Sequence, residues 1–433
     1  MKLLLLYRRR WGFFYLPVVA FALAAILWAS TIALPLPPRS MLLIVESPDG
    51  SGMQLAARYR DKLDRLGIRL DIQTAKNAAE AIAALGGPGN PARATFASGL
   101  LSHLAPPDVE ALAVVGKQPL WIFTRVPNLS NLSDLRGLHV ACGDPATPTG
   151  VATALLLAHA KLTPADLRLE ALDTRRATLA LQNGNIDAMI EIGSELSASV
   201  RELTHAPGIQ IFGIERASAM VAREPRLTSF VLPEGSIELR GDIPPTDQSM
   251  VAAKTHLLVN KGMAPALQRV LLDTAQEVHE RASFLQRAGE FPQLRDTDYP
   301  LSPTASAMAF DDRPWLERFL PYHSAQWAEL LLYAIAPVLL AGILVLRWIP
   351  RLFAWRVNAV LQNYYGELKF IEAEIQPVAA DRPLELRNLL TRLDAIEEQV
   401  ARLDLPDRFA DRWYTLREHL AAARDKLFEL RAR

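Results

Sequence analysis

Short apolar runs alternate with helical patterns through the middle of the chain. The runs have the length and β-branched content of strands, and they occur at residues 41–47, 68–75, 92–98, 111–116, 120–125, 139–143, 167–173, 187–193 and 209–214. Apolar residues at helical spacing lie between most of them, at residues 54–66, 78–85, 151–161 and 175–183. Strands that alternate with helices form a mostly parallel sheet with helices on both faces. The pattern predicts an α/β fold for residues 38–326, which we call the body.

The order strand, small-residue loop, helix occurs at residues 42–63 and again at residues 139–161. We interpret the two units as two similar lobes that face each other across a cleft. The predicted bounds are about 41–135 and 246–300 for lobe 1 and about 138–240 for lobe 2, with a crossing at 131–140 and a returning strand at 248–263. Ligands of open α/β sheets bind beyond the carboxyl ends of the strands, so both loops should face the cleft.

The two loops carry the groups that we expect to bind a ligand. The candidate residues are Gly50, Ser51 and Gly52 in ESPDGSG, and Thr147, Thr149 and Gly150 in GDPATPTG. Hydroxyl and backbone N–H groups at a helix start can bind a carboxylate without a charged partner. Capping of the first helical turn would explain the same residues without a ligand. The parallel placement of two such loops favours binding.

Three further residues are candidates for the same cleft. Ser98 ends a predicted strand and would add a hydroxyl to the rim. Trp121 fits either a wall on which a ligand stacks or an ordinary core position. Glu191 lies inside the apolar run DAMIEIG, where it either binds a ligand amine from lobe 2 or lies solvated on an edge strand.

Two long apolar segments flank the body, at residues 11–36 and 328–349. Each has about the 20 residues that a membrane-spanning helix needs. Arginines at 8–10 precede the first segment, and Arg351 and Arg356 follow the second. The positive-inside rule then places both termini in the cytoplasm and the body in the periplasm of a bacterium, with two spans in the cytoplasmic membrane. The alternatives are a cleaved signal peptide for the first segment and a buried core helix for either.

Residues 351–433 form a tail with a helical pattern of its own. Residues 1–10 form a basic head that precedes the first span. Apolar residues at spacings of three and four form a coiled-coil stripe at Leu386, Leu389, Leu393, Ile396, Val400 and Leu403. Pro406 interrupts the stripe, and a second helical pattern covers residues 410–430. We predict a cytoplasmic helical hairpin, with self-association of the stripe as the alternative.

Composition excludes several functions. Lysine and arginine total 47 and so do aspartate and glutamate, so no net charge attracts nucleic acid. A single cysteine, Cys142, allows no internal disulfide and no thiolate metal cage. Neither the metal motif H-E-x-x-H nor the nucleophile motif G-x-S-x-G occurs in the sequence. We therefore expect no metal, no cofactor and no enzymatic activity.

Six segments of the body, in order, resemble the TAXI family, the solute-binding subunits associated with TRAP transporters. They are SPDGSGMQLAARY, ATFASG, KQPLWIFTR, NLSDLRGLHVACGDPATPTG, LQNGNIDAMIEIG and LVNKGMAPAL. The resemblance covers residues 42–320, and the second apolar segment with YYGELKFIEAEI is similar to a subgroup anchored at its carboxyl end. Two features depart from the family. The loop GSGMQL lacks the usual threonine and aromatics, and typical members are secreted free.

The resemblance implies a body of the type II periplasmic-binding-protein class, whose lobes close on a small carboxylate such as an amino acid or a dicarboxylic acid. It also implies delivery of that ligand to TRAP-type permease subunits. Carried over by motif, the cleft would be lined by Gly50, Ser51, Gly52, Ser98, Trp121, Thr147, Thr149 and Gly150. The alternative function is a transmembrane receptor that uses the same cleft and signals through the tail.

Overall fold

The structure is a computed structural model, and it describes residues 16–28, 38–46, 51–86, 92–127, 129–195, 197–283, 285–310, 315–320, 322–375, 383–403, 405 and 407–432. The chain divides into two compact units. One is residues 36–326, which contain the body, and the other combines residues 1–35 with residues 327–433. We describe each unit by itself.

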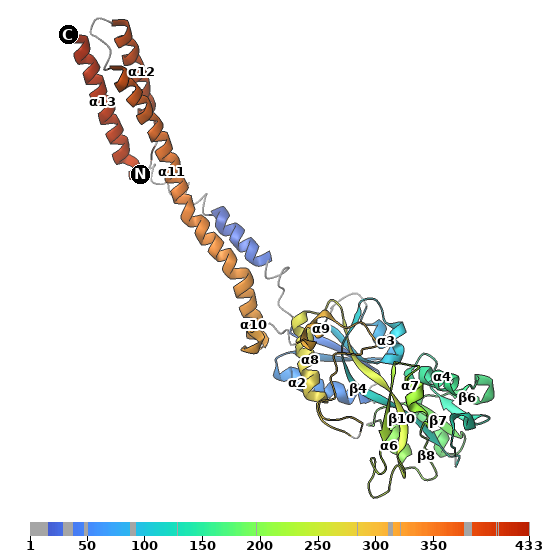
Figure 1. The fold of residues 1–433 in the computed structure, drawn as a ribbon. Coiled ribbons are helices and arrows are strands. Elements are labelled where there is room, and N and C mark those ends of the chain that lie inside the picture. Colours follow the sequence, from blue (N-terminus) through green and yellow to red (C-terminus); the bar gives the residue numbers. More distant parts are fainter. Residues whose placement is uncertain are drawn as a thin grey trace. The chain divides into compact units, whose positions relative to one another are not determined.

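A single mixed sheet organises the body (Figure 1). Its ten described strands are β1 (Ser40–Glu46), β2 (Arg69–Ala75), β3 (Arg93–Ser98), β4 (Val109–Thr124), β5 (His139–Cys142), β6 (Arg168–Ala171), β7 (Ala188–Ile192), β8 (Gln210–Ile211), β9 (Leu227–Leu232) and β10 (Gln248–Asn260). The spatial order is β2-β1-β3-β10-β4-β7-β5-β6, with β8 paired to β4 and β9 to β10. Lobe 1 lies on the β2 side of this order, and lobe 2 lies on the β6 side.

Helices cover both faces of the sheet, as the alternating pattern predicts. The helices of the body are α2 (Ser51–Arg65), α3 (Ala78–Ala83), α4 (Pro148–Ala160), α5 (Thr174–Gln182), α6 (Ala198–Thr204), α7 (Ala217–Val221), α8 (Pro265–His279) and α9 (Pro303–Ala309). A 3₁₀ helix, η2 (Gly99–Leu104), follows β3 directly. In lobe 1, α2 and α8 pack on one face of β1 and α3 on the other. In lobe 2, α4 and α7 pack on one face, and α5 and α6 on the other.

The two longest strands, β4 and β10, connect the lobes. The first half of β4 pairs with β10, and its last residues, Leu120 to Thr124, pair with β7 in lobe 2. β10 pairs with β9 at its start and with β3 of lobe 1 at its end. The returning strand predicted at 248–263 is therefore present as β10, whereas the crossing expected at 131–140 is wrong. The chain passes into lobe 2 within β4, which joins the two strands predicted at 111–116 and 120–125.

These connections also explain why the sheet is mixed rather than mostly parallel. β1, β2 and β3 pair in parallel, and so do β5, β6 and β7. β4 and β10 run antiparallel to each other and to their neighbours in each lobe. The chain passes from lobe 1 to lobe 2 in β4 and returns in β10, so these two strands run in opposite directions. The parallel pattern therefore holds inside each lobe and ends at the junction.

The other unit is helical. α10 (Tyr322–Glu329), a π-helical segment at Leu330–Ile335 and α11 (Ala336–Ile375) follow one another without a gap. Within the described residues, one helix is long and apolar enough to cross a membrane, at Ser324–Trp348. The helix at Leu16–Trp28 is apolar but shorter. The expectation of two spans therefore stays a prediction.

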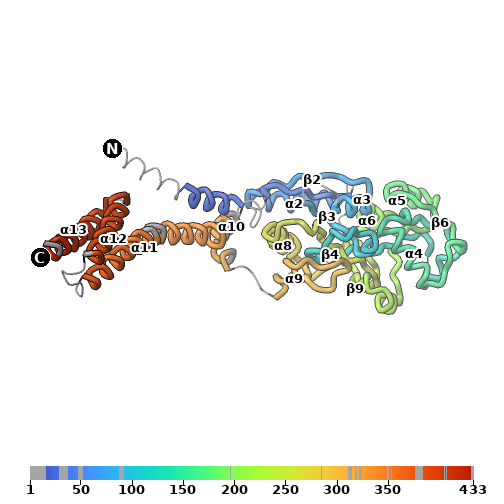
Figure 2. The backbone as a smooth tube through the Cα atoms, turned by 90° about the horizontal axis from the view of Figure 1, so that it is seen from above, coloured from blue at the N-terminus to red at the C-terminus, as the bar shows by residue number. Residues whose placement is uncertain are grey.

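The tail forms three packed helices, where we expected a hairpin. α12 (Pro383–Ala401) and α13 (Ala410–Ala432) form the predicted pair, and the second half of α11 packs against both (Figure 2). The predicted stripe faces this core, for Leu393 and Val400 are fully buried there. Leu361 and Ile371 of α11 fill the same core. The apolar stripe therefore packs against other helices of the same chain.

Candidate functional site

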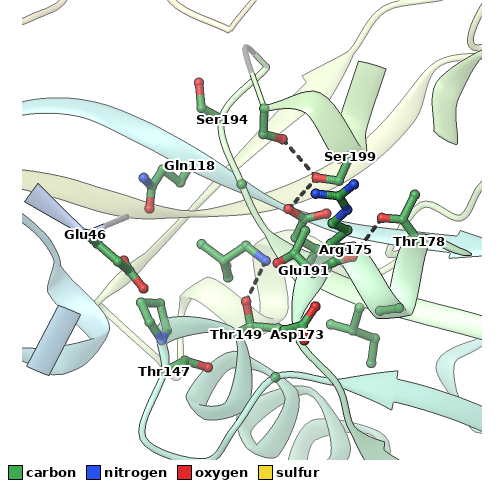
Figure 3. Close-up of a pocket in the computed structure, with 18 of the residues that line it drawn as sticks. Glu46, Gln118, Thr147, Thr149, Asp173, Arg175, Thr178, Glu191, Ser194 and Ser199 are labelled. Carbon is green, nitrogen blue, oxygen red and sulfur yellow. Dashed lines mark hydrogen bonds between the residues drawn. The ribbon is translucent and has the colours of Figure 1, made fainter. Parts of the chain in front are cut away.

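A cavity of about 1070 Å³ lies between the two lobes and is lined from both (Figure 3). Lobe 1 contributes the ends of β1 and β3 and the start of α2. Lobe 2 contributes the ends of β5 and β7 and the starts of α4, α5 and α6. This is the carboxyl edge of the parallel strands of each lobe, where ligands of α/β sheets bind. The volume is just above the usual range of about 300–1,000 Å³ for sites that hold small molecules.

The structure brings five of the nine candidate residues to this cavity. Gly52 and Ser98 line it from lobe 1, and Thr147, Thr149 and Glu191 line it from lobe 2. Gly150 and Trp121 are not among the lining residues. Gly50 lies outside the described residues. Ser51 is the first residue of α2, and its side chain is likewise outside the described part of the chain.

Thr147 caps helix α4. Its hydroxyl oxygen accepts a hydrogen bond from the Gly150 N–H at 3.2 Å, and the hydroxyl donates to the Asp144 carbonyl at 2.6 Å. Gly150 permits this tight turn, because a Cβ there would lie 2.2 Å from the Asp144 oxygen. Both functions of the Thr147 hydroxyl are therefore used within the loop. The capping interpretation accounts for this residue.

Thr149 has a different role. Its hydroxyl oxygen accepts a hydrogen bond from the backbone N–H of Ile192 at 3.1 Å. This bond ties the start of α4 to the end of β7. A hydroxyl that accepts one hydrogen bond can still donate its proton, and Thr149 is only half-buried at the cavity wall. Thr149 is thus a structural link that can also donate to a bound solute.

Glu191 is the buried carboxylate of the cavity wall. It lies on β7, which is an interior strand between β4 and β5, and its side chain is 5% exposed. The Ser199 hydroxyl donates to Oε1 at 2.7 Å, while Oε2 is buried with no hydrogen-bond partner among the described residues. Burial raises the pKa of Glu191 to about 7, and the hydrogen bond from Ser199 opposes that rise. The alternative of a solvated residue on an edge strand is wrong.

Trp121 belongs to the core of lobe 2. It is fully buried and stacks on Phe123, with ring centroids 5.9 Å apart. Its indole N–H donates to the Gly193 carbonyl at 3.0 Å. Trp121 also pairs with Glu191 across β4 and β7. The interpretation as a stacking wall is therefore corrected: Trp121 supports the loop after Glu191 from behind.

On the lobe 1 side, Ser98 accepts a weak hydrogen bond from the Leu100 N–H at 3.4 Å and caps η2. Glu46 ends β1 and is exposed, and Gln118 reaches the cavity from β4 (Figure 3). Neither Glu46 nor Gln118 was predicted. Both lie at strand ends or junctions, so a search of every polar residue at those places would have found them.

The charges of the lining are mainly acidic. The carboxylates are Glu46, Asp144, Asp173, Glu191 and Glu202, and the basic residues are Arg175 and Arg201. Both arginines are exposed. Within the described residues, no group of three or more His, Cys, Asp or Glu side chains could hold a metal ion. The cavity therefore offers a hydrogen-bonding wall with a negative excess rather than a simple anion site.

One family model matches the middle of the chain. Residues 108–306 match the model of the NMT1-like family. The NMT1-like region starts one residue before β4 and ends inside α9, so it contains both linking strands and all of lobe 2. Thr149, Glu191 and Ser199 lie within it. The resemblance to the TAXI family stays a prediction.

Solved structures add three similarities. The periplasmic aliphatic sulphonate binding protein SsuA from Escherichia coli is 14% identical, with 71% of this chain and 83% of that chain covered and a TM-score of 0.39. MatC from Rhodopseudomonas palustris with bound malate is 14% identical over 70% and 98%, with a TM-score of 0.37. An ABC transporter periplasmic binding protein from Brucella ovis with glutathione bound is 11% identical over 55% and 66%, with a TM-score of 0.37. No curated protein matches the chain.

Proposed function

We propose that the protein is a membrane-anchored solute-binding protein whose body captures a small organic acid outside the cytoplasm for a TRAP-type transporter. One observation carries the proposal: the cavity lies between two lobes, and each lobe lines it with strand ends and helix starts. The similarity to the NMT1-like family over lobe 2 and the linking strands supports it.

Binding would occur by closure of the lobes about β4 and β10. A solute that contacts both walls gains contacts only in the closed state, so it shifts the population towards closure. The start of α4 is suited to a carboxylate because the helix dipole is positive there, although Pro148 has no N–H and the Gly150 N–H is already bonded to Thr147. The Thr149 hydroxyl adds a donor at the same place.

Anchoring is proposed from the helix Ser324–Trp348. Its length and apolar composition suit a membrane span, and Leu340, Ile343 and Leu344 on it are exposed. Anchorage is tested by alkaline carbonate extraction of membranes that contain the full chain. The protein should stay in the membrane pellet, and its release into the supernatant would contradict the anchor.

Solute binding is tested with the purified full chain in detergent, by thermal shift against amino acids and other small organic acids. A solute at a hundred times its Kd adds about 2.7 kcal/mol to the free energy of unfolding, so a binder should raise the melting temperature clearly. The Thr149→Val variant should bind that solute more weakly. If no compound raises the melting temperature, the proposal of a solute-binding cleft is wrong.

A receptor function is the second candidate, and the tail is the observation that favours it. α11, α12 and α13 form a packed core of their own, which capture of a solute does not need. Deletion of residues 383–432 tests this function. A transport protein should keep both affinity and solute uptake, whereas a receptor should keep affinity and lose its output.

A further inference from the structure

We propose that Glu191 is the specificity-determining residue of the cleft and that its carboxylate binds a protonated amine of the solute. The inference rests on the proposed binding function, and it narrows the solute class to small organic acids that carry an amino group. Acids without an amine, including dicarboxylates, would be discriminated against at this position.

The first step is the incomplete hydrogen bonding of Glu191. Oε1 accepts from Ser199 at 2.7 Å, whereas Oε2 is buried and has no hydrogen-bond partner among the described residues. A buried polar atom without a partner costs free energy, and a charged one costs more. The residue lines the cavity, so a bound solute can supply the missing donor. An ammonium group provides that donor and the opposite charge together.

The second step is that the protein does not neutralise Glu191 by itself. Arg175 and Arg201 also line the cavity, but both are exposed, and no ion pair within the described residues joins either of them to Glu191. Ser199 is neutral, and its hydroxyl is 3.3 Å from the Ser197 hydroxyl. No ion pair among the described residues supplies a counter-charge for an ionised Glu191, so an ammonium group of the solute can supply it.

The third step is the place of Glu191 beside the start of α4. Thr149 in the first turn of α4 bonds to the N–H of Ile192, which directly follows Glu191 on β7. A site for a carboxylate and a site for an amine are thus adjacent. An α-amino acid carries these two groups one carbon apart and fits such an arrangement. A dicarboxylate would instead place a second negative charge against Glu191, which is repulsive in a buried site.

Protonation follows from the same surroundings. Burial holds the pKa of Glu191 at about 7, so its carboxyl is protonated in part of the molecules near neutral pH. An amine binds the ionised form, so binding at a pH just below 7 should release a proton from Glu191. Solute affinity should fall as the pH is lowered further, because the protonated carboxyl has to lose its proton first.

The experiment compares pairs of acids that differ by one amino group. Alanine with propanoate, aspartate with succinate, and glutamate with glutarate are titrated calorimetrically into the full chain in detergent. Wild-type protein should bind the amino member of at least one pair about tenfold or more tightly than its partner. Glu191→Gln should remove that preference and leave the affinity for the acid without an amine unchanged or higher.

The matched control is Glu215→Gln, which removes an exposed carboxylate of lobe 2 outside the cavity lining and should leave the preference intact. Titrations in two buffers of different ionisation enthalpy should show proton release with wild-type protein and none with Glu191→Gln. The melting temperature of each variant shows that it is folded.

The outcomes separate this inference from the proposed function. If wild-type protein binds both members of a pair equally, or if Glu191→Gln keeps the preference for the amine, the assignment of Glu191 is wrong and solute binding stands. If no member of any pair binds and the wider thermal-shift screen also finds nothing, the proposed function fails and the amine site fails with it.

Discussion

The two lobes follow the same construction and differ in chemistry. In each lobe a parallel strand leads through a loop of small residues into a helix at the cavity, β1 to α2 in lobe 1 and β5 to α4 in lobe 2. The lobe 2 wall is built around a buried carboxylate and a threonine that links two elements. The described lobe 1 wall offers an exposed carboxylate, Glu46, and a weakly capping serine, Ser98. A repeated local structure therefore does not imply repeated ligand contacts.

The largest expected difference between the lobes concerns one glycine in each. In Gly150→Ala, the new Cβ would lie 2.2 Å from the Asp144 oxygen and 2.7 Å from the Pro145 Cα, both on the backbone. Because the backbone has to move, the free energy of unfolding should fall by about 3 kcal/mol or more.

The control is Gly52→Ala in lobe 1, where, among the described residues, the Cβ would meet the Val45 Cβ at 3.8 Å and nothing nearer. Alanine is the better helix former, so this variant should be unchanged or more stable by about 0.5–1 kcal/mol. Chemical denaturation of both variants checks the pair. Equal destabilisation would mean that the two loops are constrained alike.

The second prediction concerns the link between α4 and β7. Thr149→Val keeps the shape of the side chain but leaves the Ile192 N–H without its acceptor, so it should cost about 1–3 kcal/mol. Hydrogen exchange at the Ile192 amide should accelerate. Thr153→Val on the same helix is the control, because the Thr153 hydroxyl only donates to the Thr149 carbonyl. An unchanged exchange rate at Ile192 would contradict the link.

The third prediction is a pH dependence that the buried Glu191 carboxyl gives to lobe 2. The pKa of Glu191 is about 7 in the folded protein against 4.5 for an unperturbed carboxyl, so unfolding releases a proton between these pH values. The free energy of unfolding of wild-type protein should therefore fall as the pH rises through this range, relative to Glu191→Gln. The slope is at most about 1.4 kcal/mol per pH unit.

Denaturation of both proteins at several pH values, without solute, measures this difference. It should level off above about pH 7, where Glu191 is ionised in both the folded and the unfolded state. Parallel curves for Glu191→Gln would show that its carboxyl is not held protonated by burial.

The smallest predicted effects compare the two caps. Thr147→Ala removes the cap of α4 and should cost about 1 kcal/mol. Ser98→Ala removes a longer bond, 3.4 Å, at the short helix η2 and should cost less. Thermal denaturation gives both values. If Ser98→Ala destabilised the protein more than Thr147→Ala, the cap in lobe 1 would be the stronger one, contrary to this prediction.

Much of the α/β body could be predicted, because its strands and helices differ clearly in period. Part of the cavity lining was predicted, because Thr149 lies in the small-residue loop GDPATPTG before a helix and Glu191 is a polar residue inside the apolar run DAMIEIG. The hydrogen bond between Ser199 and Glu191 was missed because Ser199 lies on the short helix α6, and only the folded structure brings it to β7.

The errors have local causes. Gly116 and Pro119 suggest a turn, yet β4 continues through both residues. At this point β4 ends its pairing with β10 and begins its pairing with β7, so a residue without a backbone N–H is tolerated. Trp121 could not be placed because both faces of β4 are buried, so alternation along the strand does not separate core from wall. In the tail, the sequence did not show that α11 packs against α12 and α13. The apolar residues of α11 that do so follow directly on the predicted membrane span, from which they could not be separated.

The unbroken run from Tyr322 to Ile375 has a mechanical consequence. The apolar stretch and the part of α11 that carries Leu361 and Ile371 belong to one continuous helix, and no loop separates them. Because a helix has a fixed rise per residue, the distance along residues 336–375 cannot change without breaking backbone hydrogen bonds.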